Sequence, residues 1–128
     1  MTFTKIYSGT PPGDVNVTVG NARWSLKLRR DLRDHSPTGF AWGYGGSGPS
    51  QLSLAILCDA LKDDERALRL YQQFKWAYIA LLPKDCPWQL TLNQIKDWVA
   101  KHDPDPPSAG AVLGAAMRDQ AVDERGAA

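Results

Sequence analysis

Apolar side chains occur at every second position on both sides of a Gly20-Asn21 dipeptide, between residues 15 and 28. This period is typical of half-buried strands, and Gly and Asn tolerate the positive φ angles of tight hairpin turns. The pattern predicts an antiparallel hairpin whose apolar residues share a face or are offset by one pair: Val15, Val17 and Val19 with Trp24, Leu26 and Leu28. Residues 3–7 read as an earlier strand, and residues 40–42 as a further short one.

Helical spacing begins after a run of glycines. Pro49 suits a first helical residue, and the helix that it opens is apolar on nearly all sides as far as Leu61, which indicates a buried, central position. A second helix is predicted from Asp63 to the proline at 83. Thr91 and Gln94 have the spacing of a capping box, which predicts a third helix to about His102.

Strands therefore precede helices along the chain, which favours an α+β fold over an alternating parallel sheet. We expect an antiparallel sheet of three or four strands packed by three helices, with a C-terminal extension. Residues 1–102 are predicted to form the single domain. Residues 103–128 begin with the sequence DPDPPS and are predicted to be a linker followed by a flexible or weakly helical C-terminal segment.

Charge and cysteine content exclude several classes of site. The formal net charge of the 128 residues is +1, which gives no global attraction to nucleic acid or a membrane. Cys58 and Cys86 have neither metal-ligand spacing nor a reason to pair, and no cofactor motif or metal set is present. Because no apolar run has the length of a signal peptide or membrane span, we expect a cytoplasmic protein.

A glycine-rich loop formally matches G-x-G-x-x-G ahead of the first helix. The preceding strand is too short, and the following element is a second helix, so a dinucleotide-binding unit is not expected. Exposed N–H groups at a helix start still attract anions, whereas the alternative and favoured interpretation is a tight turn. The candidate ligand-binding residues are Gly43, Tyr44, Gly45, Gly46, Ser47 and Gly48.

Basic residues just ahead of that loop give a second candidate site. Arginine forks suit phosphates and carboxylates alike, although a solvated polar face is the alternative. The candidate charged contact surface comprises Lys27, Arg29, Arg30, Arg33 and His35. An enzyme using His35 and Ser47 is a weak third alternative, and no catalytic residue is assigned.

The run WGYGGSGP at residues 42–49, followed by Gln51-Leu52, resembles the signature of a small prokaryotic family of unknown function. The sequence SPTGF at residues 36–40, the pair Phe74-Lys75 and the later Trp88, Ile95 and Trp98 are also similar to that family. The resemblance covers roughly residues 5–100. Similar genes occur in bacteria, archaea, phages and plasmids, so the resemblance implies a fold and a mobile-element setting, but no activity.

These observations favour a non-enzymatic accessory or binding protein of a bacterial mobile element or phage, which acts by contact with a partner protein. Counter-defence is one role that such a protein performs. The alternative is a module that binds an anion, a nucleotide or nucleic acid at the glycine-rich loop; nucleic acid is the less favoured partner. Neither the identity of the partner nor the oligomeric state follows from the sequence.

Overall fold

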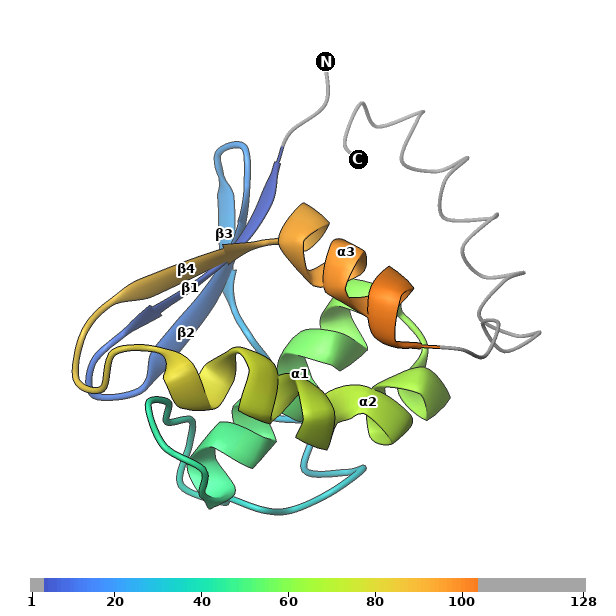
Figure 1. Cartoon of the computed structure of the whole chain (residues 1–128). Coiled ribbons are helices and arrows are strands. Elements are labelled where there is room, and N and C mark those ends of the chain that lie inside the picture. Colours follow the sequence, from blue (N-terminus) through green and yellow to red (C-terminus); the bar gives the residue numbers. More distant parts are fainter. Residues whose placement is uncertain (1–3, 104–128) are drawn as a thin grey trace.

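Three helices cover one face of a four-stranded antiparallel sheet in the computed structural model, which describes residues 4–103 (Figure 1). The predicted α+β class is confirmed, with four strands. In chain order the elements are β1 (Lys5–Thr10), β2 (Asp14–Val19), β3 (Ala22–Ser25), α1 (Ser47–Leu61), α2 (Asp64–Ala77), the 3-10 turn η1 (Ile79–Leu81), β4 (Trp88–Thr91) and α3 (Leu92–His102).

The predicted hairpin is present, with Gly20 at positive φ in its turn. Val17 lies opposite both Tyr7 and Trp24, so these three side chains share the face that meets the helices. The strand order is β3-β2-β1-β4, which places β3 and β4 at the edges. One detail was wrong: β3 ends at Ser25, and Leu28 lies beyond the strand.

The fourth strand is not where the sequence placed it. Residues 40–42 form no strand, and β4 instead pairs with β1 through the register Tyr7↔Leu90 and Gly9↔Trp88. Trp88 and Leu90 are buried while Gln89 is exposed, which is the alternation of a half-buried strand. In the sequence, an alternation over only four residues cannot be distinguished from a loop. The strand with which β4 pairs also lies about eighty residues earlier in the chain.

The first helix is central, as predicted: α1 packs against both α2 and α3, and twelve of its fifteen residues are buried. The start was predicted two residues late, because Gly46 is the N-cap and Pro49 is the third helical residue. Proline is tolerated there because the first-turn N–H groups have no intrahelical partner.

The second helix is shorter than predicted. Asp63 caps it by accepting a hydrogen bond from Arg66 N, but the helix ends at Ala77 and the chain continues as η1. In a continuing α-helix the carbonyl of Ile79 would need the N–H of residue 83, which is a proline. That carbonyl accepts instead from Leu82 N at 3.4 Å and from Gly43 N at 3.0 Å.

The capping box of α3 is confirmed in both directions: Gln94 N donates to Thr91 Oγ1 at 3.1 Å, and Thr91 N donates to Gln94 Oε1 at 2.8 Å. The last described residue, Asp103, has a side chain only 1% exposed and forms an ion pair with Arg66 at 2.7 Å. The rest of the predicted C-terminal segment, residues 104–128, lies outside the described residues. Within residues 4–103, no helix is long and apolar enough to cross a membrane.

Candidate binding cleft between β3 and α1

The glycine-rich loop packs tightly against its neighbours. Gly43 has a φ of 84° and donates to the carbonyl of Ile79, and Gly45 lies under the ring of Trp76. A Cβ at Gly45 would stand 2.1 Å from that ring, closer than any real contact. The loop thus has a structural reason for glycine, because a side chain at Gly45 would push Trp76 away.

The helix start beside this loop offers few donors. Pro49 supplies no N–H, and Ser50 N already donates to Gly46 O at 3.0 Å. The buried amino group of Lys75 lies 3.2 Å from Ser50 Oγ and 4.5 Å from the centre of the Trp76 ring. A cavity beside the loop is lined by Tyr44 together with Lys84 and Asp85, and the cleft that Arg29 lines contains no residue of the loop. A ligand-binding role for Gly43–Gly48 stays a prediction.

The predicted charged surface is divided between several internal contacts. Arg30 pairs with Asp34 at 3.0 Å, and Arg33 Nη1 donates to the carbonyl of the preceding residue at 2.6 Å. His35 Nε2 lies 2.8 Å from the hydroxyl of Tyr71. Lys27 and Arg29 line a common cleft, to which the other three predicted residues do not contribute.

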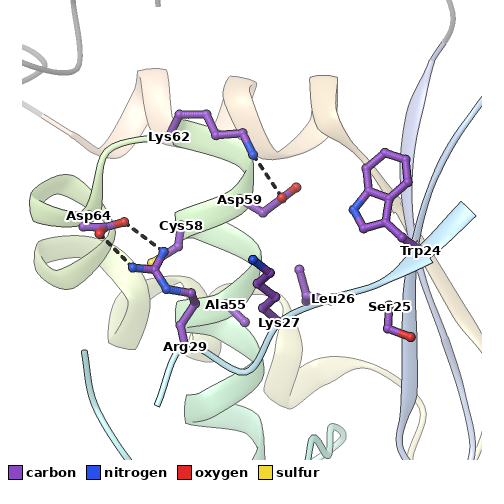
Figure 2. A pocket seen from close by; sticks show the side chains of 10 residues that line it. All are labelled: Trp24, Ser25, Leu26, Lys27, Arg29, Ala55, Cys58, Asp59, Lys62 and Asp64. Atoms are coloured by element: carbon purple, nitrogen blue, oxygen red, sulfur yellow. Dashed lines mark hydrogen bonds and ion pairs between the residues drawn. The ribbon is translucent and has the colours of Figure 1, made fainter. Parts of the chain in front are cut away.

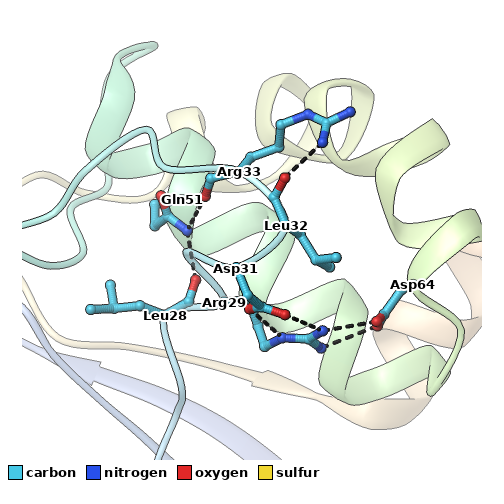
Figure 3. A network of polar contacts seen from close by, with 7 residues as sticks. All are labelled: Leu28, Arg29, Asp31, Leu32, Arg33, Gln51 and Asp64. Atoms are coloured by element: carbon cyan, nitrogen blue, oxygen red, sulfur yellow. Dashed lines mark hydrogen bonds and ion pairs between the residues drawn. The ribbon is translucent and has the colours of Figure 1, made fainter.

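A single buried glutamine fixes the path of the segment that carries these residues (Figure 3). Gln51 Nε2 donates to the carbonyls of Leu28 at 2.6 Å and Arg33 at 3.0 Å. Its Oε1 accepts from the backbone N–H groups of His35 at 2.8 Å and Ser36 at 3.1 Å. The amide is fully hydrogen-bonded, so it holds residues 28–36 against α1 at no cost in unsatisfied polar groups.

Arg29 connects this segment to the start of α2. Its guanidinium forms two hydrogen bonds with Asp64, at 2.8 and 3.1 Å, and two with Asp31, at 3.1 and 3.2 Å (Figure 3). These carboxylates, Asp64 first, raise the pKa of Arg29 above its ordinary value. The φ of Arg29 is 59°, a left-handed conformation that costs a non-glycine residue energy and that the two carboxylates help to hold.

A cleft of about 500 Å³ lies between β3, the C-terminal half of α1 and the start of α2 (Figure 2). Trp24 stands on one side of it, on the edge strand, and is 42% exposed. In its lining, Lys62 pairs with Asp59 and Arg29 pairs with Asp64, and Lys27 also lines it. The full lining is Trp24, Ser25, Leu26, Lys27, Arg29, Ala55, Cys58, Asp59, Lys62 and Asp64.

Asp59 is held by three donors. Tyr7 Oη donates to its carboxylate at 2.5 Å, Lys5 Nζ lies at 2.8 Å and Lys62 Nζ at 3.1 Å. Burial opposes ionisation of Asp59, but the hydrogen bonds from Lys5 and Tyr7 and the positive charges of Lys5 and Lys62 together outweigh it, so its pKa lies below the ordinary value. Burial raises the pKa of Tyr7 and lowers that of Lys5.

Cys58 contributes a neutral thiol to the cleft. Burial raises its pKa to about 12, with the nearby Asp64 carboxylate adding to the shift, so almost no thiolate exists at neutral pH. The described residues contain no group of His, Cys, Asp and Glu able to hold a metal ion. The cleft thus offers the aromatic face of Trp24 and the amino group of Lys27, while its carboxylates are paired with cations of the same chain. This combination suits binding.

Sequence reasoning missed most of this cleft. Trp24 was assigned only to the hairpin, and no role in a site was given to Asp59, Lys62 or Asp64. The one signal in the sequence is that Asp59 and Lys62 carry charge at the end of an otherwise apolar run. The lining residues converge because β3 lies beside the C-terminal half of α1.

The fold and the cleft define a small α+β domain with helices on one face of an antiparallel sheet and a cleft at the β3 edge. The chain belongs to a family of unknown function, DUF6166, whose model matches residues 7–101. The expected membership of a family without an assigned activity is thereby confirmed. No curated protein and no solved structure matches the chain.

Proposed function

We propose that the domain is a non-enzymatic binding protein that contacts a partner protein through the cleft between β3 and α1. The observation that carries this proposal is the half-exposed Trp24, which stands on an edge strand at the rim of a cleft. Tryptophan is enriched among the residues that dominate binding energy at protein interfaces, since it buries a large area. The cleft also carries the polar groups needed to orient a partner.

The titratable groups of the cleft support binding over catalysis. Asp59 already accepts from three donors, Arg29 is engaged by two carboxylates, and Cys58 is protonated at neutral pH. A general base needs a free carboxylate or imidazole within reach of substrate, and a cysteine nucleophile needs a thiolate. The paired charges in this cleft instead stabilise the domain, and Lys27 and Trp24 remain exposed for contact with a partner.

The same proposal includes the genetic origin of the protein and the compartment in which it acts. The resemblance of the sequence to genes of phages and plasmids favours a mobile-element protein that acts in the cytoplasm. A host protein of an antiviral or anti-plasmid pathway is then the expected partner. Recovery of a partner with no defence role would overturn the counter-defence part and leave the binding role intact.

Co-purification with the full chain tests the binding role. We expect a stoichiometric partner that is lost with Trp24→Ala and retained with Trp76→Ala, a matched change of an exposed tryptophan on α2. Lys27→Glu, with Lys101→Glu on α3 as its control, checks the result at exposed positions that should not affect folding. A partner lost with Trp76→Ala and kept with Trp24→Ala would move the contact to the glycine-rich loop and overturn the proposal.

A further inference from the structure

Within residues 4–103, no strand pairs with the outer edge of β3. The Leu26 N–H donates to the Val15 carbonyl at 3.0 Å, and this pair continues the register in which Val17 faces Trp24. In an antiparallel ladder such hydrogen-bonded pairs alternate with non-bonded ones. The intervening residues, Arg23 and Ser25, therefore direct their N–H and C=O groups away from β2. All four β3 residues are exposed.

The cleft begins at this same edge. Trp24 shares the sheet face that meets α1, and Figure 2 shows its indole across the cleft from Asp59 and Lys62. An additional strand along β3 would bring alternate side chains over Trp24 and Leu26. The edge backbone and the cleft are thus placed to act together.

The charges around this edge favour an acidic occupant. Within residues 4–103, Arg23 and Lys27 are exposed and have no acidic partner, whereas Asp59 and Asp64 are each engaged by cations. The cleft lining holds three cations against two carboxylates. A carboxylate entering the cleft meets the free amino group of Lys27, whereas an added cation meets only carboxylates that are already paired.

From this geometry we infer that the partner contributes an extended, acidic segment that pairs with β3 as a fifth strand. One apolar side chain of the segment packs on Trp24, and an Asp or Glu side chain reaches Lys27. Main-chain hydrogen bonds to Arg23 and Ser25 supply affinity, while the cleft supplies specificity, as in other complexes formed by strand addition. The inference rests on the proposed function, since it specifies the partner of the same cleft.

A random dodecapeptide library displayed on phage, selected against the full chain, tests this inference. We expect the selected peptides to carry an Asp or Glu two positions away from an apolar residue, so that both side chains lie on the same face of the added strand. Ser25→Pro removes one outward N–H without touching the β2 ladder and should raise the Kd about tenfold, while Ser25→Ala should not. Lys27→Glu should weaken binding by a similar factor, and Lys101→Glu should not.

Hydrogen exchange provides the second measurement: the amides of Arg23 and Ser25 should become protected when a selected peptide is added. Peptides without acidic enrichment, or binding that is insensitive to Ser25→Pro, would overturn the inference. A dimer of the free protein that Ser25→Pro dissociates would show that a second copy occupies the edge. If the library yields nothing while a cleft-dependent partner still co-purifies, the proposed function stands and the extended segment is wrong.

Discussion

The indole of Trp88 lies directly over Gly9, its neighbour across the β1–β4 pair, so that a Cβ at Gly9 would stand 2.1 Å from Trp88 Nε1. Glycine therefore leaves the space that this side chain fills. Within the described residues, Trp88 Nε1 is also the buried side-chain nitrogen that has no hydrogen-bond partner. Packing on Gly9 and edge-to-face against Trp42, at 5.7 Å between ring centres, holds the indole in place.

Gly9→Ala tests this contact. The added methyl group has to displace the indole, so we expect the free energy of unfolding to fall by about 1–3 kcal/mol, as for other overpacked cores. Urea denaturation followed by tryptophan fluorescence measures the change. Ser8→Ala, on the opposite face of β1, is the control and should alter stability by far less. Equal stability of the two variants would show that Trp88 relocates freely.

The capping box predicts a cost at a position outside the core. Thr91→Ala removes the side-chain acceptor of Gln94 N, and we expect a loss of about 1 kcal/mol. The measurement is the midpoint of chemical denaturation, with Asn93→Ala, at an exposed position in the first turn of α3, as the matched change. An unaltered midpoint for Thr91→Ala would mean that water replaces the cap without loss.

Asp103 links the end of α3 to α2. Asp103→Ala leaves the mostly buried Arg66 without its carboxylate, and we expect the free energy of unfolding to fall by about 3 kcal/mol. Thermal unfolding of the full chain measures the effect, and the exposed Asp97→Ala on α3 is the control. A loss no larger than that of the control would place the ion pair among those that contribute nothing measurable.

Acid should weaken the domain partly through Asp59. Because the pKa of this carboxyl in the folded state is below its ordinary value of 3.8, the unfolded state takes up the proton more readily. The contribution of Asp59 is thus fully present well above the ordinary value and is lost as pH falls through the folded pKa. Stability plotted between about pH 2 and pH 6 should be flatter for Asp59→Asn than for the wild type or for Asp97→Asn. Parallel curves would exclude Asp59 as a source of acid sensitivity.

A double-mutant cycle separates the structural role of the glycine-rich loop from a ligand role. Gly45→Ala alone should destabilise the domain by about 1–3 kcal/mol, since the methyl group meets the Trp76 ring. In a Trp76→Ala background the same change should cost markedly less, because the obstructing ring is gone. Denaturation of all four proteins gives the coupling energy. An additive cycle would mean that Gly45 is required for some reason other than packing.

The parts of the fold that the sequence predicted are local in origin. The hairpin turn at Gly20-Asn21 and the capping box at Thr91 and Gln94 depend on residues within a few positions of one another. By contrast, β4 pairs with β1, and Gly9 leaves room there for Trp88, so this strand depends on residues far apart in the chain. The early end of α2 likewise combines a local cause, Pro83, with a distant one, the hydrogen bond from Gly43.

The cleft could be predicted even less well, because no local pattern contains it. Trp24 and Lys27 come from the hairpin and its exit, Asp59 and Lys62 from the end of α1, and Asp64 from the start of α2. Net charge and motif searches treat these residues separately. Only the pairing of acids with Arg29 and Lys5 shows that Lys27 is left without a counter-ion in the described part of the chain.

Gln51 binds only main-chain atoms: two carbonyls and two N–H groups of the segment between Leu28 and Ser36. These four hydrogen bonds therefore do not depend on which side chains the segment carries. Apart from Arg29 and His35, which bind other side chains, exposed positions such as Arg30, Arg33 and Asp34 can change the shape and charge of the surface while the backbone keeps its course, much as variable loops do on a constant framework. These exposed positions are therefore a part of the surface that can diversify without refolding of the domain.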